Sequence, residues 1–156
     1  MAMAMRLNQF LNEHQVEYEV LAHPHTATSM ETAEAAHVPG DKLAKTVILE
    51  DDRGYVMAVL PATHKVDLGT LHRELNRPLG LASEPELDSL FNDCELGAIP
   101  PIGTAYGLET IVDDSLAEQP DVYFDAGDHE HLVHMDSETF VNLLEGARIT
   151  HFSRHV

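Results

Sequence analysis

The hydrophobic positions near the start of the chain change from a helical to a strand period. Residues 5–15 carry leucines and a phenylalanine spaced as on one face of a helix, and residues 16–20 then alternate apolar and polar as in a strand. Thr28 and Glu31 have the spacing of a capping box before an alanine-rich segment, which predicts a short helix near residues 29–37. The chain is therefore predicted to open with helix, strand and helix.

The central segment has the clearest strand pattern. In residues 44–62, two β-rich runs flank the polar turn "DDRG", which predicts a hairpin of central strands. Asp67 is placed to cap a helix in residues 68–76, and Ser83 with Glu86 to cap another in the segment that follows. We expect a brief strand between these two helices.

The last third of the chain mixes short apolar runs of strand length with one helical segment. Strands are expected in residues 107–114, 121–127, 131–135 and 148–153, the last at a sheet edge, and a helix in 137–146. With no repeat or linker, this irregular order predicts an α+β fold, one domain over residues 1–156 with short helices around a mixed sheet. No GxGxxG or GxxxxGK[ST] loop supports a doubly wound nucleotide-binding sheet.

Composition narrows the class of protein. The chain has 156 residues, 44% of them hydrophobic and 23% charged, which is typical of a globular domain. No apolar run approaches the roughly 20 residues that span a bilayer, and the single cysteine, Cys94, can form no internal disulfide. We therefore expect a cytoplasmic protein without a membrane partner.

The charge of the chain is strongly acidic. Nine Lys and Arg residues stand against 27 Asp and Glu residues, a formal net charge of −18. This excess opposes broad binding to DNA or RNA, so DNA is not expected as a partner and any nucleic-acid contact must be local. Solubility or adaptation to salt is the simpler interpretation of the excess.

Lys45 opens the apolar run "KTVIL". An ammonium group is costly to bury there unless it meets an anion or reaches solvent. Lys45 is therefore a candidate anchor for a carboxylate, a phosphate or a carbonyl oxygen. The alternative is a strand-end lysine that simply reaches water.

Several histidines form a second group of candidates. In a strand, His129 and His131 would share one face and could bind one metal ion if His23 or His25 supplied a third ligand. No HExxH helix supports that hypothesis. Polar loop and strand-end histidines are the preferred interpretation, so no metal is expected.

The segment "GAIPPIG", residues 97–103, is apolar but rich in proline and glycine. Pro100 and Pro101 fix φ at about −65° and stiffen the peptides before them. Gly97 allows close approach to the backbone, so N–H groups around residues 97–99 could hold a carbonyl oxygen or oxyanion. A rigid turn is the alternative. Cys94 has no base beside it in a recognisable motif and is interpreted as a packing thiol.

Six segments, in this order, resemble the YbaK/prolyl-tRNA synthetase-associated editing domain family from about residue 16 onward: "AKTVIL", "YVMAVLPATHKVDLGTL", "LGAIPPIG", "ETIVDDSL", "VYFDAGDHEHLVHM" and "ETFVNLLEGARI". The family lysine matches Lys45, and the family GxxxP motif matches Gly97 to Pro101. The resemblance implies a mixed sheet rolled into a partial barrel. It also implies a free-standing aminoacyl-tRNA deacylase, which hydrolyses the ester between a wrong amino acid and its tRNA.

The resemblance also implies roles for single residues. In the family, the lysine is assigned to the terminal adenosine or its phosphate and the glycine loop to the aminoacyl carbonyl, so Lys45, Gly97 and Ala98 are expected to be catalytic. Water, helped by a ribose hydroxyl of the substrate, is the expected nucleophile, and no metal or organic cofactor is implied. The residues expected to bind substrate are Thr28, Met30, Thr46, His64, Ile99, Pro100, Pro101, His129 and His131.

The expected partner is the acceptor end of a mischarged tRNA. A cationic rim would suffice for this local contact if five side chains converge: Lys42, Lys45, Lys65, Arg73 and Arg77. The alternative function is a non-catalytic module of the same fold that binds a small molecule or a protein. The sequence leaves open the amino acid, the tRNA and the choice between monomer and homodimer.

Overall fold

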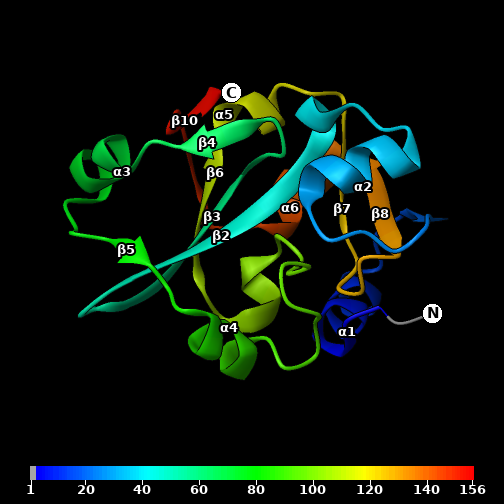
Figure 1. The fold of residues 1–156 in the computed structure, drawn as a ribbon, viewed down its shortest axis with the longest axis horizontal. Coiled ribbons are helices and arrows are strands. Elements are labelled where there is room, and N and C mark those ends of the chain that lie inside the picture. Colours follow the sequence, from blue (N-terminus) through cyan, green and yellow to red (C-terminus); the bar gives the residue numbers. More distant parts are fainter. Residues whose placement is uncertain (1–2) are drawn as a thin grey trace.

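A long hairpin forms the centre of the fold in the computed structural model, which describes residues 3–156 (Figure 1). Its strands are β2 (Leu43–Asp51) and β3 (Gly54–Pro61), paired antiparallel with Asp51 opposite Gly54. Every residue of β3 from Val56 onward is buried, as its continuous apolar run requires. The predicted central hairpin is confirmed.

The hairpin lies within a mixed sheet whose strand order is β1-β8-β7-β2-β3-β6-β9. β7 is parallel to β2, β6 to β3 and β9 to β6, whereas the other neighbours are antiparallel. The short strand β5 (Gly80–Leu81) also pairs with β2, and β4 (His64–Val66) pairs with β10 (Ser153–His155) in a small second sheet. The remaining strands are β1 (Glu19–Ala22), β6 (Glu109–Asp113), β7 (Asp121–Asp125), β8 (His131–Asp136) and β9 (Arg148–Thr150).

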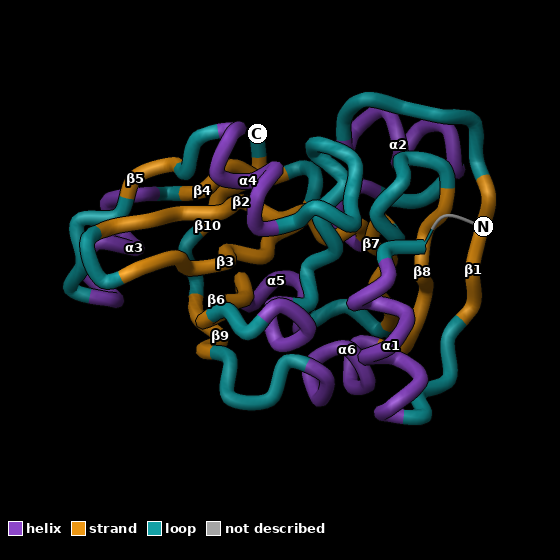
Figure 2. Tube along the Cα trace, turned by 90° about the horizontal axis from the view of Figure 1, so that it is seen from below, coloured by secondary structure: helices purple, strands orange, loops and turns teal. Residues whose placement is uncertain are grey.

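Helices cover both faces of the sheet. Around β7 and β8, α1 (Met5–His14) and α6 (Ser137–Leu143) lie on one side and α2 (Ser29–Ala36) on the other (Figure 2). The side chains of Phe124, Val133 and Phe140 belong to the core on the first side. The remaining helices are α3 (Leu68–Leu75), α4 (Glu84–Leu90), α5 (Asp114–Ala117) and the 3-10 turns Gly40–Lys42 and Gly103–Tyr106. The expected α+β fold with a mixed sheet is confirmed. Within residues 3–156, no helix is long and apolar enough to cross a membrane.

The predicted helix caps are present. The hydroxyl of Thr28 accepts a hydrogen bond from the backbone N–H of Glu31 at 3.2 Å, and Asp67 caps α3 through the N–H of Thr70 at 3.1 Å. At α4, the carboxylate of Glu86 accepts from the backbone N–H of Ser83 at 3.1 Å. These local polar contacts explain why the starts of the helices were predictable.

Two strand predictions need correction. The first strand is Glu19–Ala22 and not residues 16–20, because pairing with β8 begins at Glu19, and Val16 and Tyr18 instead pack against the core. The strand expected over residues 148–153 is divided into β9 and β10, since the backbone N–H groups of Phe152 and Ser153 donate to the carboxylate of Asp113.

Candidate functional site

A small pocket lies where β2, the start of α2, the end of β7 and the glycine-proline loop, residues 96–103, meet. It encloses about 70 Å³. Five of the predicted site residues line it: Lys45, Thr46, Gly97, Ile99 and His129. Lys45 and His129 are 84 positions apart in the sequence, and the structure brings them to the same pocket.

Three further polar residues belong to the same wall; Ser29 and Thr32 fall in the loop 25–32 that was a candidate lining segment, whereas Asp125 was missed. Ser29 and Thr32 reach the pocket from α2, and Asp125 reaches it from the end of β7. The hydroxyl of Thr32 donates to the backbone carbonyl of Thr28 at 3.0 Å, which holds it against the first turn of the helix. The signal for Asp125 was its place before Ala126-Gly127, where a carboxylate commonly accepts from the N–H groups of its own turn.

Seven predicted residues lie outside the pocket wall. Thr28 is occupied as the cap of α2, and Met30 is half exposed and packs against Gly40. His64 contacts the hydroxyl of Ser153 at 2.8 Å, and burial lowers its pKa. The ring of His131 turns to the carboxylate of Asp128 at 2.6 Å. The other three residues are buried in the glycine-proline loop: Ala98, Pro100 and Pro101.

Lys45 is the cation of the pocket. Its ammonium donates to the backbone carbonyl of Ala62 at 3.3 Å and has no carboxylate partner within residues 3–156. Burial lowers the pKa of Lys45 below its ordinary value, and the nearby charge of Lys65 lowers it further. Lys45 is thus a partly desolvated, unpaired cation beside a polar cavity. Its attraction for a ligand anion or carbonyl oxygen is stronger there than it would be in water.

The glycine-proline loop is held through its carbonyl groups. The hydroxyl of Thr46 donates to the carbonyl of Ile99 at 2.8 Å, and the ring of His129 contacts the carbonyl of Leu96 at 2.6 Å through Nε2. Within residues 3–156, the backbone N–H groups of Gly97 and Ile99 have no hydrogen-bond partner. The N–H of Ala98 donates to the carbonyl of Glu95 at 3.0 Å, so it is already engaged.

Gly97 has φ +81°, in the left-handed region that favours glycine. A Cβ atom at this position would lie 3.6 Å from the ring of His129, an ordinary contact distance. The strained backbone, and not a clash, is therefore the reason that glycine fits here. This conformation turns the chain so that Gly97 and Ile99 both line the pocket while Ala98 faces the core.

Asp125 and His129 form the polar end of the pocket. Oδ1 of Asp125 accepts from the backbone N–H of Gly127 at 2.8 Å and of His129 at 3.3 Å, which fixes the turn. Burial raises the pKa of the Asp125 carboxyl despite these bonds. His129 lies before β8, with φ +60°, so the strand alternation expected for His129 and His131 does not apply.

A hydrogen bond between a histidine and a glutamate lies next to this end of the pocket. His25 contacts the carboxylate of Glu95 at 3.0 Å, and this hydrogen bond raises the pKa of His25. The ring of His25 lies edge-on to His129, with 5.5 Å between centroids. Since Glu95 is two residues before Gly97, its hydrogen bond with His25 also fixes the start of this loop at the protein surface.

The five cations of the predicted rim do not all converge. Arg77 is buried, and its guanidinium binds the carboxylate of Asp51 at 2.8 Å through Nε. Since Asp51 is six residues along β2 from Lys45, about 20 Å in an extended strand, Arg77 lies far from the pocket. Lys42 is paired with Asp121 at 2.8 Å. The convergence expected of these cations was wrong, because each of the two meets a carboxylate closer to it.

Cys94 is not placed as a nucleophile. Burial raises the pKa of its thiol to about 12, and the sulfur contacts the hydroxyl of Tyr106 at 3.2 Å. A thiol with this pKa is almost entirely protonated at neutral pH. The structure supports the interpretation of Cys94 as a packing residue.

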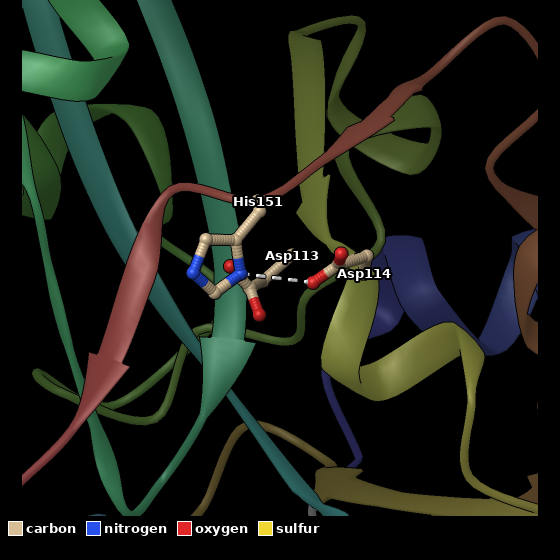
Figure 3. Close-up of side chains that lie close together, drawn as sticks. All are labelled: Asp113, Asp114 and His151. Atoms are coloured by element: carbon tan, nitrogen blue, oxygen red, sulfur yellow. Dashed lines mark hydrogen bonds and ion pairs between the residues drawn. The ribbon is translucent and has the colours of Figure 1, made fainter.

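One group of possible metal ligands occurs among the described residues: Asp113, Asp114 and His151 (Figure 3). Figure 3 shows His151 and Asp114 facing each other, and their closest atoms are 3.2 Å apart. Asp113 is already engaged, because it accepts from the N–H groups of Phe152 at 2.9 Å and Ser153 at 3.0 Å and from Ser115. This group is a structural clamp on the C-terminal segment, and it contains none of the predicted histidines.

Comparison with known families identifies an editing domain. The model of the aminoacyl-tRNA editing domain matches residues 23–143, which include the pocket and the glycine-proline loop. No curated protein sequence matches the chain.

Solved structures share the whole fold at low sequence identity. A proposed trans-editing enzyme for prolyl-tRNA synthetase is 23% identical, with a TM-score of 0.83 and coverage of 97% of this chain and 96% of that one. The hypothetical protein APE2540 is 21% identical, with a TM-score of 0.85 and coverage of 96% and 99%. A scaffold carrying a computationally grafted epitope is 20% identical, with a TM-score of 0.85 and coverage of 98% and 97%.

Proposed function

The chain belongs to the aminoacyl-tRNA editing domain family, and from that premise we propose that it is a free-standing deacylase that hydrolyses the ester of a mischarged tRNA. One observation carries the proposal: an unpaired Lys45 and the uncommitted N–H groups of Gly97 and Ile99 line the same pocket. Family membership makes an aminoacyl-tRNA the substrate to test. The neighbour described for prolyl-tRNA synthetase makes mischarged tRNA for proline the first candidate.

The proposed chemistry needs little from the protein. An aminoacyl ester is already activated, so positioning and stabilisation of the developing oxyanion are the main requirements. The N–H groups of Gly97 and Ile99 are the proposed oxyanion donors, in place of the engaged N–H of Ala98. Lys45 would hold the ribose-phosphate side of the substrate, and water helped by a ribose hydroxyl would be the nucleophile.

His129 and Thr46 are proposed as positioning residues. Each holds a carbonyl of the glycine-proline loop, at Leu96 and Ile99, and so orients the peptides that carry the donor N–H groups. The pocket of about 70 Å³ would admit only a small amino-acid side chain. Exclusion by size separates neighbouring side chains by about 1 to 3 kcal/mol for each methylene group.

The experiment is a deacylation panel. The protein is incubated with tRNAs carrying cognate and wrong amino acids, and the loss of the ester is compared with spontaneous hydrolysis. We expect at least one mischarged tRNA to be deacylated, and Lys45→Ala and Gly97→Ala each to reduce the rate by about 100-fold. Arg73→Ala, at an exposed position of α3, is the control. A panel with no accelerated member leaves a non-catalytic binding module as the function. A Lys45→Ala variant of normal rate overturns the assignment of Lys45 to the site.

A further inference from the structure

A second hollow borders the pocket along the edge of β2. It encloses about 210 Å³ and shares Thr46, Gly97 and Ile99 with the pocket. Its other walls are apolar and come from β2, β5 and α4, through Val47, Ile48, Leu81, Ala82 and Leu87. A ligand could therefore occupy both spaces at once, with its centre at the three shared residues.

The hollow follows the edge of the strand and not one of its faces. Thr46, Val47 and Ile48 are consecutive, and successive side chains of a strand point to opposite faces. A space that touches all three must lie beside the strand. On this edge, the pairing with β7 ends at Ala44 and the pairing with β5 includes Leu49, so the sheet has a gap between them.

Thr46 presents its backbone polar groups to this gap. In an antiparallel ladder, alternate residues direct both groups to the partner strand, and Leu43 directs its carbonyl to the N–H of Ala62 at 2.8 Å. By alternation, Thr46 and Ile48 point to the opposite edge. Ile48 is used there, because its carbonyl accepts from Ala82 at 3.0 Å. On this edge, within residues 3–156, neither β7 nor β5 has a residue paired with Thr46, so its backbone N–H and carbonyl face the gap.

We propose that the hollow binds the adenine of the terminal adenosine of the tRNA, an inference that rests on the proposed function. The Watson–Crick edge of adenine offers a donor, the N6 amino group, next to an acceptor, N1. The N–H and carbonyl of Thr46 form the complementary pair on an extended residue. Proteins commonly read unpaired RNA ends in this way, by hydrogen bonds to the base edge and apolar contact with its faces.

The apolar walls fit the flat faces of a base. Leu81 is 69% exposed and lines the hollow, so its side chain is free to contact the face of a bound base. With adenine in the hollow and the amino acid in the pocket, the ester between them lies at the shared residues, beside the N–H groups of Gly97 and Ile99.

The probes are 5′-AMP and 5′-IMP, titrated into the protein with backbone amides monitored by NMR. Inosine exchanges donor and acceptor on the same edge, so it opposes both groups of Thr46. We expect AMP to shift the amide of Thr46 and to bind about tenfold more tightly than IMP. Leu81→Asp should weaken AMP binding and raise the KM for deacylation, each about tenfold. Met5→Asp is the matched control, because Met5 is 66% exposed on α1, outside both spaces.

Three results would overturn the inference: AMP signals confined to residues outside the hollow, equal affinity for AMP and IMP, or an unchanged KM in Leu81→Asp. The proposed function is judged separately. If the protein deacylates tRNA and Leu81→Asp leaves KM unchanged, the adenine site is wrong but the proposed activity stands. AMP binding at Thr46 by a protein that deacylates no tRNA would leave the site and remove the activity.

Discussion

The hydroxyl of Thr46 donates a 2.8 Å hydrogen bond to the backbone carbonyl of Ile99, which joins the central strand to a loop 53 positions further along the chain. This contact fixes the height of the loop above β2. It therefore links the position of the proposed oxyanion donors to a central strand of the sheet, as preorganised catalysis requires.

We predict that Thr46→Val lowers kcat while the protein remains folded. The variant keeps the size and branching of the side chain but leaves the Ile99 carbonyl without its donor, at a cost of about 1 to 2 kcal/mol in the free energy of unfolding. Single-turnover deacylation and urea unfolding measure the two effects. Thr46→Ser keeps the hydroxyl and should retain most of the activity; equal losses in both variants would contradict the role of the bond.

Lys45 is predicted to cost stability at neutral pH. Burial lowers its pKa, so the unfolded chain retains this proton to higher pH than the folded chain. Between the two pKa values the unfolded state binds more protons, and the stability of the wild-type protein therefore rises with pH relative to Lys45→Met. We expect Lys45→Met to match or exceed the wild-type Tm at pH 7, with an advantage that shrinks towards pH 10.5. A marked loss of Tm at pH 7 in this variant would contradict the prediction.

Asp113 is predicted to be the main acid-sensitive clamp of the C-terminal segment. Burial alone would raise its pKa, but hydrogen bonds from Ser115, Phe152 and Ser153 outweigh that effect and lower it. Its contribution to stability is therefore present above the ordinary carboxyl pKa and is lost as the pH falls through the folded value. Asp113→Ala should reduce the free energy of unfolding by about 3 kcal/mol at pH 7.

The matched control for the clamp is Asp114→Ala, which changes the neighbouring, more exposed carboxylate. We expect it to alter stability by less than about 1 kcal/mol. Urea unfolding at pH 7 and pH 3 should show the difference between wild type and Asp113→Ala shrinking in acid. A difference that stays constant with pH would mean that packing, and not the ionised carboxylate, holds the segment.

Arg77 is predicted to act in folding and not in tRNA binding. Its ion pair with Asp51 is buried, and the guanidinium lowers the pKa of Asp51 to about 2. Arg77→Ala leaves that carboxylate unpaired and should lower Tm by several degrees, while kcat/KM for deacylation stays unchanged at a temperature where the variant is folded. Arg73→Ala should change neither quantity. A selective rise in KM for tRNA in Arg77→Ala would restore this arginine to the binding surface.

Local patterns predicted much of the fold. The hairpin around "DDRG" and the caps at Thr28, Asp67 and Ser83 depend on residues a few positions apart, and all are present. The division of the last strand depends instead on Asp113, about 40 positions earlier, whose carboxylate takes two backbone N–H groups from the ladder. Such a competition between a side chain and a strand leaves no trace in periodicity.

The site followed the same rule. Lys45 and Gly97 could be chosen as site candidates from the sequence alone. A cation in an apolar strand and a flexible glycine before two prolines both cost stability, so each suggests a functional role. Asp125 was missed although His129 is only four positions away, because the pocket joins it to Lys45, Thr46 and the glycine-proline loop, which are segments distant in sequence. The prediction of a cationic rim was wrong because it counted cations without knowing their partners. In the structure, Lys42 is paired with Asp121 and Arg77 with Asp51.

The interruption in the pairing of β2 also affects association between molecules. An unpaired strand edge normally invites a strand from another chain, which is a route to aggregation. Here the gap lies between Ala44, where pairing with β7 ends, and Leu49, where pairing with β5 begins. It is shorter than a typical strand of about five residues. A flat molecule the size of a nucleobase can enter such a gap, but a polypeptide strand cannot. The same short opening that would admit a ligand thereby protects the sheet from edge-to-edge polymerisation.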